Sequence, residues 1–516
     1  MALEVTDWTP PGKGRWTLER SHFGGEFTPV YRDVYQRAQH DGMKATMARY
    51  GAPASHMAIA YVNDRPYMRM VPLFEPPGGT SRRPPAVLIW LLSRVHPQFR
   101  RRNKAARQML AARQWSTDGE RWYRDQKPAM IAGNLALQDE PIESMSDVDL
   151  AGHLGRVIDN VYRGVRLHFE LVGCDAFPVG DFFVVAAEWG IGLDEALALL
   201  AGSSADTARL LASGDVDAYL RHYGWRAVAN YDVDSPTVGE MPHVVKATLA
   251  AVLENPHVDA VPPIAEARAR VPATDHARFD ALLDEARYAY GIRDDNAGIT
   301  LQWTVGLVRR ALLEIGGRFV KAGRVSAVED IFELTPDEIA QLLVDNTGPS
   351  REEVAQRRER RQANNALDAP RELGPEDQIP PLKPMPPALR RVTASFIIQA
   401  DLLYSDGDAP PLTGTGIGTA LISGPARVVR SAEDAFDRLQ PGDILVTTMT
   451  TPAYDAVLPM LAGLVVEEGG PMSHAAIVAR EFGLPAVVGA RDALLHITDG
   501  QRIELDPRAG TVRVLN

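Results

Sequence analysis

The segment Val465–Gly489, VVEEGGPMSHAAIVAREFGLPAVVG, constrains the fold more than any other stretch of this chain. It begins and ends with β-branched residues, which favour buried strands. Gly469 and Gly470 permit a sharp turn, and Ser473 is a favourable N-cap for a helix. Gly483, with a proline two residues later, is typical of a helix end. The segment therefore predicts a strand, a tight loop, a helix and a second strand.

His474 follows this N-cap and stands in the first turn of the predicted helix. Free N–H groups and the positive end of the helix dipole favour an attached or incoming phosphate there. We interpret His474 as a nucleophile that carries a phosphoryl group. A surface histidine behind an ordinary glycine turn explains the local pattern equally well. A metal site is less favoured, because no second His, Cys or acid stands at ligand spacing on this helix.

Residues 413–516 read as a separate α/β block. Short β-like runs such as DILVTTM, GLVVEE and RIELD alternate with turn signals such as PGD, TDG and PRAG. Helical pieces, SAEDAFDRL and SHAAIVAREF, lie between them. A block of about 100 residues is an ordinary domain size.

This block resembles the phosphoenolpyruvate-utilising enzymes, a family that includes phosphoenolpyruvate synthase, pyruvate phosphate dikinase and rifampin phosphotransferase. The family motif has two glycines, two residues, Ser or Cys, His, then Ala-Ile-x-Ala-Arg-Glu and Gly-Leu-Pro-Ala-Val, and Gly469–Val487 matches it. The resemblance covers essentially all of Thr413–Leu515. It implies a swivelling β/β/α domain in which His474 shuttles phosphate between two remote sites. It also implies that four residues bind or support the phosphate: Gly469, Gly470, Ser473 and Arg480.

Two positions depart from the family pattern. Family members often carry Thr where this chain has Val466 and Met472. A hydroxyl at either position would hydrogen-bond the phosphate. The departures therefore bear on whether His474 is phosphorylated and dephosphorylated in catalysis. They slightly favour a protein that keeps the fold and the histidine without catalysis.

Residues 1–345 are predicted to form a mainly helical, substrate-binding domain. We expect a helix over Val30–Tyr50, a hairpin turn at Asn63-Asp64, and a helix that begins after Thr335. The layout resembles the substrate-binding middle domain of rifampin-phosphotransferase-like proteins. That resemblance implies a pocket for a small, hydroxylated and largely apolar molecule.

Residues 346–412 are predicted to link the two parts. A charged helix, REEVAQRRERRQ, precedes a Pro-rich stretch that favours an extended connector. We interpret the arginine run as a solvated helix face. The whole chain is thus predicted to be a multidomain α+β protein, with the helical part first and the swivelling domain at 413–516.

Four residues of the helical part are candidates for an acceptor site: His22, Arg293, Asp294 and Asp295. The RDDN stretch at 293–296 is expected between two helices, where Arg would hold a phosphate and Asp would take a proton. His22 is a candidate general base. A capping and salt-bridge cluster explains RDDN as well, and a lone histidine is more often structural.

Composition and net charge limit the classes of partner that we expect for this chain. The net charge of −12, without a basic stripe interleaved with aromatics, argues against nucleic acid. The single cysteine, Cys174, fits a reducing compartment. The longest apolar run, AVLIWLL at Ala86–Leu92, is far shorter than the roughly 20 residues that span a bilayer, and we interpret it as a buried strand or helix. We expect a cytoplasmic protein without a membrane partner.

The sequence contains no glycine-rich phosphate loop followed by the Lys and acidic metal ligands of nucleotide chemistry. We therefore expect no cofactor on this chain, and ATP and Mg²⁺ on a separate ATP-grasp subunit, similar to that of pyruvate phosphate dikinase. His474 would carry the phosphoryl group from there to a hydroxyl of a small, largely apolar molecule, as in systems similar to phenylphosphate synthase. The alternative is a non-catalytic ligand-binding or regulatory protein that retains the fold.

Overall fold

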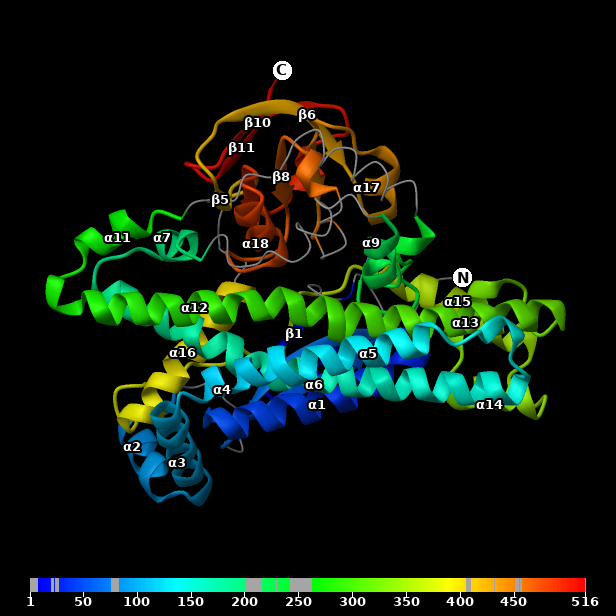
Figure 1. Ribbon diagram of the computed structural model, residues 1–516, viewed down its shortest axis with the longest axis horizontal. Coiled ribbons are helices and arrows are strands. Elements are labelled where there is room, and N and C mark those ends of the chain that lie inside the picture. The colour runs from blue at the N-terminus through cyan, green and yellow to red at the C-terminus, as the bar shows by residue number, and fades with distance from the viewer. Residues whose placement is uncertain are drawn as a thin grey trace. The chain divides into compact units, whose positions relative to one another are not determined.

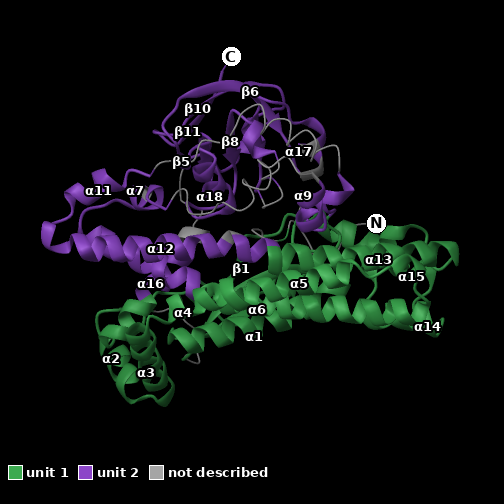
Figure 2. Cartoon of the chain, viewed as in Figure 1, with its two compact units in different colours: residues 1–173, 230–235, 299–393 green, residues 174–229, 236–298, 394–516 purple. Residues whose placement is uncertain are grey.

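The computed structural model describes residues 8–19, 23, 27–75, 83–200, 216–228, 230–241, 262–404, 410–430, 432–450, 454 and 457–515. The chain divides into two units that each combine distant stretches of sequence (Figure 2). Unit 1 comprises residues 1–173, 230–235 and 299–393, and unit 2 comprises residues 174–229, 236–298 and 394–516. The predicted boundaries at 345/346 and 412/413 describe changes in sequence character and stay predictions.

Unit 1 is mainly helical and contains one small sheet (Figure 1). Its described helices are α1 Pro29–Tyr50, α2 Ala86–Val95, α3 Pro97–Ala112, α4 Gln114–Arg121, α5 Lys127–Gln138, α13 Trp303–Lys321, α14 Pro336–Val344 and α15 Arg351–Asn365, and α6 Asp147–Glu188 begins here. The sheet has the order β2-β3-β1-β4, formed by β1 Trp16–Leu18, β2 Ala54–Val62, β3 Arg65–Pro72 and β4 Glu372–Leu373.

Several local predictions for this unit are confirmed. The expected helix over Val30–Tyr50 is α1. Asn63 and Asp64 join β2 to β3 with φ angles of 50° and 62°, the left-handed pair that suits a two-residue hairpin. Thr335 caps α14, since its Oγ1 accepts a hydrogen bond from the backbone N–H of Glu338 at 3.3 Å.

Glycines let α6 approach its neighbours closely. A Cβ on Gly164 would lie 2.2 Å from the backbone oxygen of Thr300, and one on Gly173 would lie 2.3 Å from the ring of Tyr50 in α1. Side chains at these positions would force the backbones apart, so the glycines determine how α6 packs within unit 1.

The sequence suggested that the arginine run of α15 is a solvated helix face. In the structure, several of these arginines form ion pairs instead. Arg357 pairs with Glu338 at 2.8 Å, and Arg361 pairs with Glu333 at 2.8 Å and with Asp234 at 3.0 Å. After α15, β4 pairs with β1. Part of the predicted linker is therefore held within unit 1 by ion pairs and strand pairing.

The prediction that AVLIWLL is buried was wrong. The run forms α2, in which Ile89 packs against Phe99, Met385 and Leu389, but Val87 is 77% exposed and Trp90 is 50% exposed. Hydrophobicity alone did not reveal that one face of α2 is exposed. On α3, four cations are exposed on one side of the helix: Arg100, Arg101, Lys104 and Arg107.

Unit 2 contains the predicted C-terminal α/β block and further helices. Its described helices are α7 Leu193–Ala198, α9 Val216–Tyr223, α11 Ile264–Arg270, α12 His276–Ala297, α17 Ala432–Arg438, α18 His474–Glu481 and α19 Ala493–His496, and α16 Pro387–Tyr404 ends here. The sheet has the order β11-β10-β6-β7-β8-β9-β5, with β5 Thr415–Ile417, β6 Ile422–Val428, β7 Ile444–Thr447, β8 Gly463–Val466, β9 Ala486–Val488, β10 Arg502–Asp506 and β11 Thr511–Val514.

Strands β6 to β9 run parallel, and every residue of β7, β8 and β9 is buried. Along β7, Ile444 and Val446 belong to one apolar cluster and Leu445 to another. The second cluster includes Ala475 and Ala476, so α18 covers that face of the sheet. Such double coverage explains the continuous apolar runs in these strands.

The predicted class, a multidomain α+β protein with the swivelling domain in its C-terminal part, is confirmed. Among the described residues, no helix combines the length and the apolar character that crossing a bilayer requires.

Two glycines of α6 provide a matched test of its packing. We expect Gly164→Ala to lower the free energy of unfolding by about 1–3 kcal/mol, because the new methyl group overlaps the Thr300 carbonyl. Gly155→Ala in the same helix meets nothing within 4 Å and should raise it by about 0.5–1 kcal/mol. Denaturant titration measures both, and equal effects of the two changes would contradict this packing.

Candidate functional site

The site is built where parallel strands end beside the start of a helix. β8 ends at Val466, a short loop follows, and α18 begins at His474. Ser473 has the extended backbone of an N-cap, and its Oγ accepts a hydrogen bond from the Ala476 N–H at 3.4 Å. The predicted strand, loop, helix and strand are confirmed, with His474 as the first helical residue.

The loop depends on its glycines. Gly469 has φ 106°, and a Cβ there would lie 2.7 Å from the Cβ of Ser473. The Gly470 carbonyl accepts a hydrogen bond from the Ser473 N–H at 2.9 Å. At the other end of α18, Gly483 has φ 60°, as predicted for a left-handed cap. Glycine at 469 thus allows the loop to return to the N-cap.

Thr450 lies beside the histidine, and sequence reasoning did not select it. Its Oγ1 is 3.1 Å from His474 Nδ1, and the residue is buried. Thr450 follows β7 and His474 follows the adjacent parallel strand β8, so both lie at the same edge of the sheet. The threonines of DILVTTMTTP, directly after a strand, were the signal that could have identified it. The Nε2 atom of His474 is shielded from solvent.

Arg480 is buried and directed at the loop. Its Nη1 donates hydrogen bonds to the backbone oxygens of Pro471 at 2.6 Å and Ala476 at 3.3 Å. Hydrogen bonds to a cation are stronger than neutral ones. In this arrangement the guanidinium braces the backbone that leads to His474.

Val466 and Met472, the two departures from the family motif, are both buried. Val466 belongs to the apolar cluster between the sheet and α18. Met472 and Ile477 belong to a second cluster, together with Phe182 of α6 and Tyr290 of α12. Both positions are therefore occupied by apolar side chains in close-packed surroundings.

The predicted acceptor residues lie differently from expectation. His22 and the side chain of Asp294 lie outside the described residues. Arg293 and Asp295 lie within α12, not between two helices, and a π-helical turn at Gly298–Gln302 follows. Gly298 allows close packing there, since a Cβ at this position would lie 2.3 Å from Nη1 of Arg226.

Arg293 lies one helical turn beyond Tyr290, on the side of α12 that shares an apolar cluster with Met472 and Ile477. Its Nη1 atom is buried and has no hydrogen-bond partner among the described residues. Arg287, nearer the start of α12, donates a hydrogen bond to the Leu199 carbonyl at 2.5 Å. Burial lowers the pKa of Arg287, and the charge of Glu481 in α18 opposes that effect. α12 therefore brings cations to the surroundings of α18.

Unit 1 holds a buried carboxyl group that the sequence did not reveal. Asp232 accepts hydrogen bonds from the Thr28 N–H at 2.7 Å, the Thr28 hydroxyl at 2.6 Å and the Val233 N–H at 2.6 Å. Burial raises the pKa of Asp232 to about 8, the charge of Asp234 adds to the rise, and the Thr28 and Val233 donors oppose it. These contacts fasten the start of α1 to residues 230–235.

Within the described part of the chain, no cluster of three or more His, Cys, Asp or Glu side chains could hold a metal ion.

Comparison with known proteins shows which domains this chain is similar to. Residues 439–510 match the model of the mobile domain of PEP-utilising enzymes, and this range contains Thr450, the glycine loop and α18. This part of the chain is similar to the mobile domain of the phosphoenolpyruvate-utilising enzymes. Residues 192–312 match the fourth domain of rifampicin phosphotransferase. This second match begins just before α7, includes α12 and ends within α13.

Curated relatives are similar over much of this phosphotransferase-like chain. A rifampicin phosphotransferase of Streptomyces sviceus is 29% identical over 77% of this chain and 43% of its own length. An uncharacterized phosphotransferase of Bacillus subtilis is 27% identical over 58% of this chain and 36% of its own length. The chain thus spans less than half the length of these relatives. The predicted resemblance to phosphoenolpyruvate-utilising enzymes and rifampin phosphotransferase is confirmed.

Asp232 gives this mobile-domain protein a testable pH dependence. Because the folded pKa of about 8 exceeds the ordinary value of about 3.9, the folded state binds the proton more tightly. The contribution of Asp232 to the free energy of unfolding is fully present below pH 4. It is lost as the pH rises to 8, and the free energy of unfolding then falls by up to about 1.4 kcal/mol per pH unit.

We therefore expect Asp232→Asn to flatten the fall of the unfolding free energy between pH 5 and pH 8, measured by denaturant titration. The exposed Asp345→Asn serves as a control and should leave the slope unchanged. A slope in Asp232→Asn as steep as in the wild type would contradict the assignment.

Proposed function

We propose that this chain is the phosphoryl-carrying component of a phosphotransferase. His474 takes a phosphoryl group at a donor site on an ATP-grasp partner and passes it to a hydroxyl of a small, largely apolar molecule. The observation that carries the proposal is the position of His474 at the start of α18, with Nδ1 at 3.1 Å from Thr450 Oγ1. The match to a mobile domain and the relatives named phosphotransferases support it.

The contact with Thr450 selects the reacting nitrogen. When Nδ1–H donates to Thr450 Oγ1, the lone pair resides on Nε2. Nε2 then attacks the phosphorus of the donor, an N–P bond forms, and the donor leaves with the electrons of the broken P–O bond. In the second step the acceptor oxygen attacks the phosphorus and its proton goes to a base, while the N–P electrons return to Nε2. Such covalent catalysis divides one transfer into two easier steps.

The surrounding residues suit a negatively charged group on Nε2. The free N–H groups at the start of α18 and the helix dipole favour phosphate at this end. Gly469 and Gly470 allow the backbone to come close, Ser473 holds the helix start, and Arg480 braces the loop from behind. This is a supporting role for Arg480 and needs no direct contact with the phosphate.

We propose that Arg293 binds the phosphoryl group at the acceptor site while that group passes from Nε2 to the acceptor hydroxyl. Its buried Nη1 lacks a partner among the described residues, and α12 packs against the segment that leads to His474. A guanidinium there would stabilise the charge that develops on the transferring group. Asp295, the base expected from the sequence, lies two residues further along α12 and therefore on the opposite side of the helix from Arg293.

Loading requires movement, because Nε2 is shielded from solvent here. The segment with Met472 and Ile477 would leave its apolar cluster when His474 visits the donor. ATP and Mg²⁺ would supply the phosphoryl group and neutralise its charge at that donor site. We place both at the ATP-grasp partner.

The proposal predicts that His474 becomes phosphorylated. We would incubate the protein with ATP, Mg²⁺ and an ATP-grasp partner, and record intact mass at neutral to alkaline pH because phosphohistidine is acid-labile. The wild type should gain one phosphoryl group, and His474→Ala should gain none. His496→Ala, which alters a histidine of the same domain, is the matched control and should gain one.

A second measurement separates the two steps. Arg293→Gln should load normally but pass the phosphoryl group to acceptor hydroxyls about 100-fold more slowly, as for loss of a charge-stabilising donor. Absence of loading in a folded wild type, with any donor, would contradict the carrier role. It would favour a non-catalytic binding protein, to which the buried apolar Val466 and Met472 also point.

A further inference from the structure

Residues 83–117 differ in charge from the rest of the chain. They contain eight Arg or Lys residues and no Asp or Glu, although the whole chain has 67 acids and 55 bases. These residues include α2 and α3 of unit 1. A local excess of eight positive charges in an acidic protein indicates an anionic partner for this hairpin.

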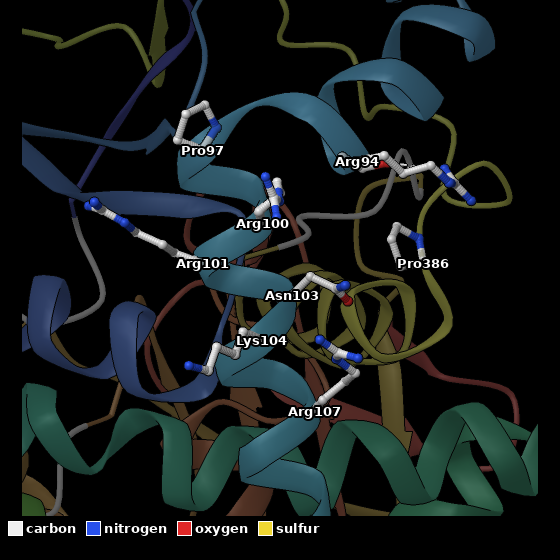
Figure 3. Close-up of a pocket in the computed structure, with 9 residues that line it drawn as sticks. Arg94, Pro97, Arg100, Arg101, Asn103, Lys104, Arg107 and Pro386 are labelled. Carbon is white, nitrogen blue, oxygen red and sulfur yellow. Dashed lines mark hydrogen bonds between the residues drawn. The ribbon is translucent and has the colours of Figure 1, made fainter.

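The cations of α3 lie on one exposed stripe. Arg100, Arg101, Lys104 and Arg107 follow helical spacing, opposite the buried Phe99, Ala106 and Met109. Figure 3 shows them projecting from successive turns of α3, where they line a pocket of 490 Å³. No ion pair or hydrogen bond joins these four cations to the described residues. The pocket lining contains no acid to neutralise them.

α2 presents an apolar face beside this stripe. Val87, Trp90 and Leu91 are 77%, 50% and 46% exposed, on the side of the helix opposite Ile89 and Ser93. The Arg94 guanidinium lies 4.8 Å from the centre of the Trp90 ring and also lines the pocket. Arg94 therefore joins the apolar face of α2 to the cationic stripe of α3.

We propose that the α2–α3 hairpin docks this protein on an anionic phospholipid surface. Cations would bind headgroup phosphates while the apolar face of α2, with Trp90, enters the interface, as in helices that lie on membranes. Charge complementarity identifies the occupant, since an acid-free cationic surface would recruit an otherwise acidic protein to anionic lipid. A nucleic acid would use the cations but would leave Val87 and Leu91 in water.

Vesicle co-sedimentation tests the proposal. The wild type should bind vesicles of phosphatidylcholine with roughly 30% phosphatidylglycerol at least tenfold more tightly than pure phosphatidylcholine vesicles, and binding should weaken in roughly 0.5 M salt. Arg100→Gln/Arg107→Gln should weaken binding roughly 25-fold, at about fivefold per cation. Val87→Ser/Leu91→Ser should weaken it roughly tenfold or more.

The exposed pair Arg360→Gln/Arg508→Gln changes the net charge equally and should bind like the wild type. An equal loss in this control, or full binding by Val87→Ser/Leu91→Ser, would overturn the proposal. Equal affinity for both vesicle types would overturn it too. Binding of short RNA in place of vesicles, unaffected by Val87→Ser/Leu91→Ser, would assign the stripe to nucleic acid.

Discussion

The hydrogen bond between Thr450 and His474 is the contact on which the account of this site depends. It joins the segments that follow two adjacent parallel strands, β7 and β8, and so requires their register. A neutral side-chain hydrogen bond adds only about 1 kcal/mol to stability. Its importance in the proposed mechanism is orientation, because a proton donated from Nδ1 to Thr450 leaves the lone pair on Nε2.

The apolar contacts of Met472 and Ile477 set the second constraint. They place the segment around His474 against α6 and α12 within unit 2, where Arg293 lies one turn away. The same burial shields Nε2, so under the proposed function this contact would suit delivery of the phosphoryl group and oppose its loading. A carrier that works at two sites needs such contacts to be reversible. Among the described residues of this segment, only the side chains of Met472 and Ile477 would have to leave this apolar cluster. Methionine adapts to irregular apolar surroundings, which suits a contact that forms repeatedly.

Local chemistry explains what the sequence could predict. The strand, loop, helix and strand around His474 follow from glycines, an N-cap and a helix end that lie within 25 residues. The hairpin turn at Asn63-Asp64 and the cap at Thr335 were equally local. The fold class and the family followed from the same motif.

The features that escaped prediction depend on neighbours distant in sequence. Thr450 reaches His474 only through the pairing of β7 with β8. Exposure of α2 depends on which of its faces is covered, and the close approach of Gly298 to Arg226 depends on a residue about 70 positions earlier in the chain. Asp232 is buried by contacts with Thr28, about 200 residues earlier in the chain. Periodicity and composition do not encode such contacts.

The central claim is that Thr450 holds Nδ1 of His474 and leaves Nε2 to carry the phosphoryl group. Long-range proton–nitrogen NMR correlation of ¹⁵N-histidine-labelled protein, before and after phosphorylation, tests it most directly, with His474→Ala identifying the signals. The account predicts a proton on Nδ1 in the free protein and the phosphoryl group on Nε2. A phosphoryl group on Nδ1, or on another histidine, would contradict it.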